Sequence, residues 1–176
     1  MMSDHVTKGK TADRIEKEFL QAYDDYADAI FRYCYFHTFN RDQGKDLMQE
    51  VFMRMWLYLH KGNTVKNMRA FLYRIANNLI IDESKKRREV SLEKLQEAGF
   101  DPGKDETQRM QDRVEHKRVL THMERLDNMY RQLIILRYIN GFSPSEIAEI
   151  TGETANTVSV RIHRGLQRLR ASLVAP

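Results

Sequence analysis

The stretch of residues 141–173 constrains the fold more than any other part of the chain, because it contains start and stop signals for two short helices. Ser143, Pro144 and Glu146 indicate a helix start: a capping hydroxyl, a proline at the first helical position, and a glutamate that reaches back from the third. Gly152 favours the left-handed backbone that ends a helix and turns the chain. The sequence therefore predicts two helices joined by a tight turn.

The second of these helices is predicted to begin near Thr154. Apolar residues then recur at steps of four, four, three and four, which keeps one side of the helix against a core. They are Val158, Ile162, Leu166, Leu169 and Leu173.

Charge distinguishes the two helices. Residues 142–153 contain three acidic residues and no Lys or Arg, whereas residues 154–176 contain four arginines and no acidic residue. This pattern predicts a helix-turn-helix whose second helix enters the DNA major groove, with small polar residues reading base edges and arginines binding phosphates. The predicted contacts are Ala155, Asn156, Thr157, Arg161, Arg164 and Arg168. The alternative is an amphipathic helix whose arginines face water.

Composition sets the outer limits of the fold. A chain of 176 residues, 41% hydrophobic and 31% charged, can form one medium domain or two small ones. Proline occurs three times and glycine eight times, and no alternating strand pattern of useful length is present, which predicts an all-α fold. The net charge of +4 is too small to indicate nucleic-acid binding by itself.

Several functional classes are disfavoured by the residues present. The lone cysteine, Cys34, cannot form an internal disulfide, and the N-terminus lacks the apolar core of a signal peptide, so we expect a cytoplasmic protein. Apolar runs are shorter than the roughly 18 residues of a membrane span. The six histidines lack metal-binding spacing, and there is no glycine-rich phosphate loop, so neither catalysis nor a cofactor is predicted.

The N-terminal half predicts further helices. After a disordered start over residues 1 to about 11, apolar residues at helical spacing predict one helix or a pair of helices up to about Cys34. The pattern breaks over residues 40–44, and residues 46–60 predict the next helix. Its core stripe is Leu47, Val51, Met55 and Leu59, with Phe52 and Trp56 beside it, and its other side carries Asp46, Gln49, Glu50, Met53 and Arg54. On spacing alone, that other side is a solvent face.

Residues 68–88 predict a third helix, after a loop over residues 61–67. Its inward residues are Phe71, Leu72, Ile75, Ala76, Leu79 and Ile80, and its opposite side carries Tyr73, Arg74, Asn77, Asn78, Asp82 and Lys85. The four cations at its end, Lys85, Lys86, Arg87 and Arg88, either complement the helix dipole or bind phosphates beside single-stranded bases. Local sequence does not decide between these interpretations.

Residues 89–112 predict a linker between two lobes, over residues 12–88 and 113–174. Residues 91–112 contain six acidic and three basic residues. They also contain two glycines and a proline, which interrupt helical periodicity. Fully extended, the linker spans roughly 80 Å. In the second lobe, a helix is predicted from Arg113 to about Leu126, with a break at Asp127 and Asn128. The predicted core beneath the helix-turn-helix is Met129, Leu133, Ile134, Leu136 and Tyr138.

Three motifs in order make the chain resemble a bacterial RNA polymerase sigma factor of the extracytoplasmic-function class. The first is D-L-M-Q-E-V-F at residues 46–52, and the second is A-F-L-Y-R-I-A-N-N-L-I-I-D at residues 70–82, followed by the four cations. The third runs from Arg131 to Arg164 through L-R-Y, E-I-A and T-V. Each motif alone is weak, but three in this order with a linker are specific.

The resemblance implies a two-lobed initiation factor that binds core RNA polymerase and promoter DNA, commonly inhibited by an anti-sigma protein. The C-terminal helix-turn-helix would recognise the distal promoter element. The residues implied for polymerase binding are Asp46, Gln49, Glu50, Met53 and Arg54. Those implied for melting the proximal element are Arg74, Asn77, Asn78, Asp82, Lys85, Lys86, Arg87 and Arg88.

Some positions depart from the family pattern. Phe71 stands where Trp is usual, Asp127 where proline is common, and Ser143-Pro144 where the turn usually contains an aromatic residue. These differences leave the family resemblance intact, but the promoter sequence preference does not follow from it. The competing interpretation is a helix-turn-helix regulator that acts without being a polymerase subunit, but it leaves the motifs at residues 46–52 and 70–88 unexplained.

Overall fold

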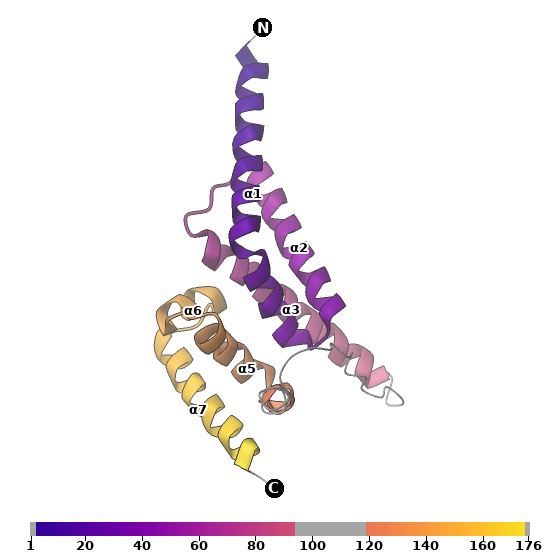
Figure 1. Ribbon diagram of the computed structural model, residues 1–176, viewed down its shortest axis with the longest axis vertical. Helices are drawn as coiled ribbons and strands as arrows, with labels where there is room; N and C mark the ends of the chain where they lie inside the picture. Colours follow the sequence, from indigo (N-terminus) through magenta and orange to yellow (C-terminus); the bar gives the residue numbers. More distant parts are fainter. Residues whose placement is uncertain (1–2, 94–118, 175–176) are drawn as a thin grey trace, which may run out of the picture.

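The structure, a computed structural model, describes the backbone of residues 3–93 and 119–174 and the side chains of residues 13–85 and 119–174. Its described elements are all helical, as predicted, and form two lobes (Figure 1). The N-terminal lobe contains α1 (Ser3–Thr38), α2 (Arg41–His60) and α3 (Met68–Glu93). The C-terminal lobe contains a helical segment at residues 119–125, α5 (Asn128–Ile134), the π-helix η1 (Ile135–Ile139), α6 (Pro144–Thr151) and α7 (Ala155–Val174). No helix within the described ranges is long and apolar enough to cross a membrane.

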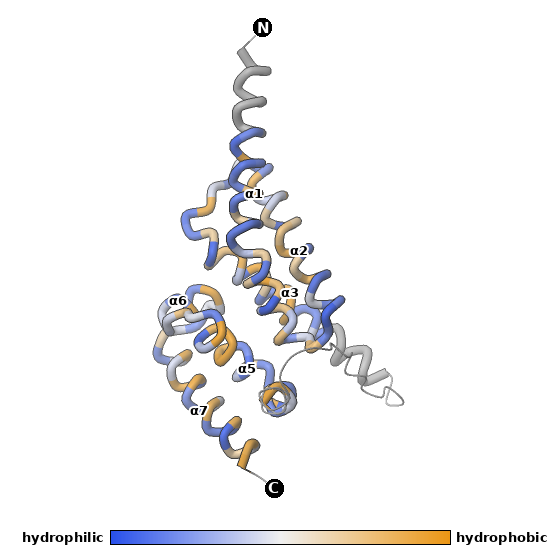
Figure 2. Tube along the Cα trace, in the orientation of Figure 1, coloured by the Kyte–Doolittle hydropathy of each residue, from blue (hydrophilic) through white to orange (hydrophobic). Residues whose placement is uncertain are grey.

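The three N-terminal helices pack against one another around a core of buried apolar residues. Hydrophobic and hydrophilic residues alternate along these helices (Figure 2). The predicted α2 stripe is largely confirmed, because Val51, Met55 and Leu59 are buried. They pack with residues of the other two helices, among them Ile30 and Leu72. Burial of such side chains contributes about 1.5 to 3 kcal/mol each.

The helix starts in this lobe differ from the predictions. α1 already begins at Ser3, so the prediction of a disordered start is wrong for residues 3–11. That segment contains Gly9 but no proline, and a single glycine costs only about 1 kcal/mol in a helix. At the other end of the lobe, α3 continues five residues past the predicted end at Arg88.

The break between α1 and α2 is also shorter than predicted. The Asn40 side chain caps α2 by accepting hydrogen bonds from the backbone N–H groups of Asp42 and Gln43, each at 3.0 Å. Gly44 therefore lies inside the helix. It allows close packing, because a Cβ there would lie 3.2 Å from the Cα of Tyr35.

The predicted start, turn and second helix of the C-terminal lobe are confirmed. The Ser143 backbone N–H donates to Glu146 at 2.8 Å, and the Glu146 backbone N–H donates to the Ser143 hydroxyl at 3.3 Å, forming a capping box. Gly152 ends α6 in the left-handed conformation, with φ 75°. The Thr154 hydroxyl then accepts from the Thr157 backbone N–H at 3.2 Å, where α7 begins.

Two residues predicted for the core of this lobe are instead exposed. Leu133, Ile134 and Leu136 are buried as predicted, whereas Met129 is 41% exposed and Tyr138 is 60% exposed. For Tyr138, the cause is the π-helical turn over Ile135–Ile139, whose wider i to i+5 bonding shifts the side chains around the axis. Sequence periodicity assumes an uninterrupted α-helix and therefore placed Tyr138 on the wrong side.

The two lobes contact each other. α6 packs against α3, and the N-terminal lobe also meets the C-terminal lobe where α1 contacts α5. Side chains of residues far apart in the sequence are thereby brought together between the lobes.

Candidate nucleic-acid and polymerase interfaces

The leading end of α7 presents small polar groups from a rigidly anchored helix. Asn156 is exposed, and Ala155 and Thr157 are half-buried, while Val158 and Ile162 fix the opposite side in the core. The anchoring keeps the exposed end in one position relative to the lobe. That arrangement suits a helix whose first turn reads base edges.

The three predicted DNA-binding arginines of α7 differ in their surroundings. Arg161 is half-buried and forms an ion pair with Glu153 in the turn that precedes the helix. Arg168 pairs with Asp127 at 2.7 Å and lies over the Tyr130 ring, with its guanidinium carbon 4.6 Å from the ring centroid. Within the described residues, Arg164 makes no ion pair and is exposed. Glu153 was not singled out from the sequence, because its contact with Arg161 depends on the path of the turn and not on helical spacing.

The polar side of α2 borders a groove of about 420 Å³. Three of the residues predicted to bind polymerase, Asp46, Glu50 and Arg54, line this groove together with Glu83 of α3. Glu50 and Arg54 form an ion pair at 2.7 Å. The other two, Gln49 and Met53, are exposed, so all five predicted residues lie on an accessible surface.

The predicted DNA-contacting residues of α3 divide into three groups. Arg74, Asn78, Asp82 and Lys85 are exposed, as expected for residues that would contact a nucleic acid. Lys86, Arg87 and Arg88 belong to α3, but their side chains lie outside the described residues. Asn77 forms the third group, because it is buried.

The predicted outward orientation of Asn77 and Tyr73 is wrong. Asn77 accepts a hydrogen bond from the Tyr33 hydroxyl at 3.5 Å, and Tyr73 lies between the Tyr33 and Phe142 rings. The cause is coverage on two sides, by α1 and by the C-terminal lobe, which helical periodicity alone does not reveal. In this structure, neither side chain is available to a DNA base.

A second hollow, of about 340 Å³, lies between the loop before α3 and α6. Loop residues 64–67 line it, together with Tyr58 of α2 and Phe71 and Arg74 of α3. Glu149 of α6 completes the lining. An acidic residue of the C-terminal lobe therefore lies beside the surface of α3 that is predicted to contact DNA.

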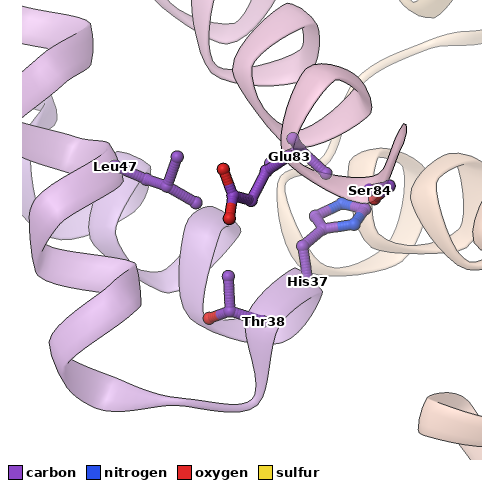
Figure 3. A pocket seen from close by; sticks show the side chains of 6 residues that line it. His37, Thr38, Leu47, Glu83 and Ser84 are labelled. Atoms are coloured by element: carbon purple, nitrogen blue, oxygen red, sulfur yellow. The ribbon is translucent and has the colours of Figure 1, made fainter. Parts of the chain in front are cut away.

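His37 lies at the end of α1, beside a small pocket of about 20 Å³ (Figure 3). Burial, and to a lesser extent the nearby Arg131 charge, lowers the pKa of His37 to about 3, so its imidazole is neutral at physiological pH. His37 Nδ1 lies 3.4 Å from Asn128 Oδ1. Among the described residues, no group of three or more His, Cys, Asp or Glu side chains is placed to bind a metal ion.

Comparison with known proteins identifies both lobes. Residues 22–90 match the family described as Sigma-70 region 2, and residues 116–169 match Sigma-70, region 4. The chain is 30% identical to the ECF RNA polymerase sigma factor SigW of Bacillus subtilis over 183 residues, covering 98% of this chain and 97% of SigW. It is 27% identical to the ECF RNA polymerase sigma factor SigL of Mycobacterium tuberculosis, covering 86% of each chain.

Solved structures show the same fold. The sigma factor RpoE from Bartonella quintana, in complex with the anti-sigma factor NepR, superimposes with a TM-score of 0.69 at 23% identity, covering 90% of this chain and 97% of RpoE. CnrH, in complex with the cytosolic domain of CnrY, also gives a TM-score of 0.69, at 24% identity, covering 97% of this chain and 96% of CnrH.

The match to region 2 excludes the alternative of a regulator that shares only the helix-turn-helix. Both motif-bearing lobes and nearly the whole length of the chain are accounted for by one family. The chain therefore belongs to the ECF RNA polymerase sigma factors and is a transcription initiation factor that directs RNA polymerase to promoters.

Proposed function

We propose that this sigma factor uses one helix for each of its three contacts. The exposed side of α2 binds core RNA polymerase, α3 contacts and opens the proximal promoter element, and α7 recognises the distal element. These helices belong to two lobes, residues 12–88 and 113–174, which are joined by residues 89–112; the first five residues of this connection continue α3. The main support for the proposal is the leading end of α7, where Asn156 is exposed and the helix is fixed by the Gly152 turn and the buried Val158.

Distal recognition is assigned to Ala155, Asn156, Thr157, Arg161, Arg164 and Arg168 of α7. Arg161 is held by Glu153, which suits a directed contact with a base, whereas the exposed Arg164 suits a phosphate. An arginine fixed before binding loses less side-chain entropy when it contacts DNA.

Polymerase binding is assigned to the groove that Asp46, Glu50 and Arg54 line on α2, together with Gln49 and Met53. The groove lining contains three carboxylates and one arginine, so its partner surface carries basic side chains. Met53 is 53% exposed and adds an adaptable apolar contact at the same surface.

Proximal contact is assigned to the exposed α3 residues Arg74, Asn78, Asp82 and Lys85, followed by Lys86, Arg87 and Arg88. Basic side chains along one helix attract a DNA backbone, and neighbouring amide groups supply hydrogen bonds to bases once the strands separate. Asn77 joins this set only in a state where its present contact with Tyr33 is broken.

We also propose that the protein acts in the cytoplasm, has no catalytic activity of its own and is inhibited by an anti-sigma protein. The relatives RpoE and CnrH occur in complexes with NepR and with the cytosolic domain of CnrY, respectively. The same kind of partner is proposed for this chain because both lobes share their fold.

The test is in vitro transcription from a randomised promoter library, using core polymerase with and without this protein. Dependence on the protein, together with enrichment of two separated sequence elements, would support a polymerase-bound factor that recognises DNA at two places. Enrichment of only one element would refute the assignment of the other lobe to DNA.

A further inference from the structure

The exposed side of α7 carries a valine. α7 packs against α5 and α6 and lies at the outer edge of the C-terminal lobe (Figure 1). Val158 and Ile162 are buried in this packing, at 0% and 7% exposure. Val160 lies two residues from each of them, and two residues turn an α-helix by about 200°. Val160 therefore projects from the opposite side of the helix, where it is 41% exposed.

Asn156 and Arg164 share this side of α7 with Val160. They lie four residues before and four residues after it, and residues four apart are neighbours on one face of a helix. Both are exposed. We call Asn156, Val160 and Arg164 the outward row. The row places an apolar side chain between an amide and a cation, on the helix that is proposed to enter the major groove.

Other polar groups at this end of α7 are already engaged within the chain. The Ser159 hydroxyl donates a hydrogen bond to the Ala155 backbone carbonyl at 2.9 Å. The Thr157 hydroxyl lies 2.8 Å from the hydroxyl of Thr154, within hydrogen-bonding distance. Within the described residues, by contrast, no hydrogen bond holds the Asn156 side chain. Asn156 therefore keeps its full hydrogen-bonding capacity for a base.

The stability of α7 gives no reason for a valine at position 160. A β-branched side chain loses rotamer freedom in a helix, so an exposed valine does not favour helix formation. Single exposed apolar residues are common on protein surfaces, and Val174, 82% exposed at the end of α7, is one of them. Val160 differs from Val174 in its place, because it lies within the outward row, one turn after Asn156.

The chemistry of the major groove selects the base that a valine can contact. Thymine presents its C5-methyl group there, whereas the other bases present hydrogen-bond donors and acceptors. A valine packed against a methyl group removes apolar surface of both from water. Against a polar base edge, it would cover a donor or acceptor without replacing the lost hydrogen bond to water. A valine on this face therefore favours thymine over the other three bases.

We propose that Val160 is a specificity-determining residue for the distal promoter element, and that it contacts the C5-methyl group of a thymine. Asn156 lies about 6 Å away along the helix axis, which is less than two base-pair steps of about 3.4 Å. Its amide matches the edge of adenine, so this adenine lies within about two base pairs of the thymine. The inference rests on the proposed function, because it requires α7 to lie in the major groove.

The test removes the methyl group from the DNA and the valine from the protein, separately and together. Transcription from the randomised promoter library first identifies the distal element that the parental protein selects. Each thymine of that element, on either strand, is then replaced in turn by deoxyuridine, which pairs with adenine in the same way but lacks the methyl group. Binding of these promoters is measured with core polymerase and the parental protein, Val160→Ala, Val160→Thr or Val174→Ala.

Val174→Ala is the matched control, because it makes the same substitution at an exposed position of the same helix, outside the outward row. Circular dichroism would establish that all variants keep the parental helical content. In the parental protein and in this control, deoxyuridine at one thymine should lower promoter affinity by about fourfold, the effect of one buried methyl group.

Val160→Ala should bind the unmodified promoter more weakly than the parental protein and lose no further affinity when deoxyuridine replaces that thymine. Val160→Thr retains a methyl group and should keep part of the sensitivity to deoxyuridine. Equal losses in the parental and Val160→Ala proteins at every thymine would overturn the proposal and leave Val160 as a surface residue only. A selected distal element without thymine would overturn it as well.

Asn156→Ala locates the neighbouring base. It should relax the preference for an adenine within about two base pairs of the thymine that responds to Val160. A preference lost farther away would overturn the arrangement of the outward row in the groove. If the parental protein selects no distal element, the proposed function of α7 fails, which is a different result from a distal element whose selection does not depend on Val160.

Discussion

Arg161 and Arg164 lie one turn apart on α7 but have different surroundings. Arg161 is paired with Glu153, whereas Arg164 is exposed. A bidentate arginine on guanine contributes roughly 1 to 3 kcal/mol of discrimination, and a phosphate contact carries no sequence information. We expect Arg161→Ala to relax preference at one or two distal positions, and Arg164→Ala to weaken all promoters about equally. Transcription from the randomised library distinguishes these outcomes.

The two substitutions should also differ in stability. Arg161→Ala leaves the half-buried Glu153 without its charged partner, so its thermal midpoint should fall, while Arg164→Ala should match the parental protein. If both variants transcribe every promoter at the parental level, α7 does not recognise the distal element.

His37 gives a residue-level prediction of pH dependence. Its pKa of about 3 in the folded protein is below its ordinary value of about 6.5, so between these values the unfolded chain binds more protons. The native stability is therefore complete above pH 6.5 and falls as pH decreases towards 3. At pH 5, the loss reaches about 2 kcal/mol at most.

The measurement is urea unfolding at pH 7.5 and pH 5.0, for the parental protein and for His37→Gln. Glutamine retains a side chain that can hydrogen-bond to Asn128 but does not titrate in this range. The parental protein should lose more stability than the variant on acidification. Equal losses would mean that the imidazole is protonated without cost in the folded state.

At the scale of single helices, α2 has one buried apolar face and one accessible polar face. One face is occupied by the core, so the accessible Gln49 and Glu50 contribute little to packing. We expect Gln49→Ala/Glu50→Ala to weaken binding to core polymerase, by about 1 to 3 kcal/mol if the contact is central, with unchanged helical content. Affinity capture of polymerase measures this. Capture at the parental level would contradict the docking assignment.

The basic end of α3 supports a prediction that depends on salt. Replacing Lys85, Lys86, Arg87 and Arg88 together with Gln removes up to four cations from one helix end. For each duplex phosphate that the protein no longer neutralises, the slope of log affinity against log salt should become shallower by about 0.9. Open-complex formation should fall more than binding of an isolated distal element. An unchanged slope would identify the run as a solvated helix end.

The helices themselves could be predicted well from the sequence where local signals agreed. Ser143, Glu146 and Gly152 specified α6 and its turn, because capping and left-handed glycine conformations depend on neighbouring residues. Tyr138 could not be placed, because the π-helical turn shifts the side-chain register without a distinct sequence signal. Predictions based on 3.6-residue periodicity fail where the period changes.

At the scale of the whole molecule, the sequence predicted two lobes but not the contact between them. Arg69 and Asn140, which form a hydrogen bond across this contact, are 71 residues apart. Arg69 lies just before the second motif, and Asn140 lies within the span of the third motif but not at one of its specified positions. Asn77 and Tyr73 were placed on an exposed face because their burial depends on α1 and the other lobe, not on α3 alone. The polar face of α2 could be predicted from the sequence, because its residues lie on one uninterrupted α-helix with a constant 3.6-residue period.

The contact between the lobes occurs within one chain, and this affects how the protein responds to its own abundance. The fraction of molecules in which the lobes are in contact depends on an effective concentration set by the tether, and not on the number of copies in the cell. Occupancy by a separate inhibitor instead follows mass action and changes with the ratio of the two proteins. Doubling synthesis of this chain would double the forms with and without this contact alike. The contact between the lobes therefore keeps the amount of active protein proportional to the total amount. A threshold in activity requires a separate inhibitor, whose amount the protein can exceed.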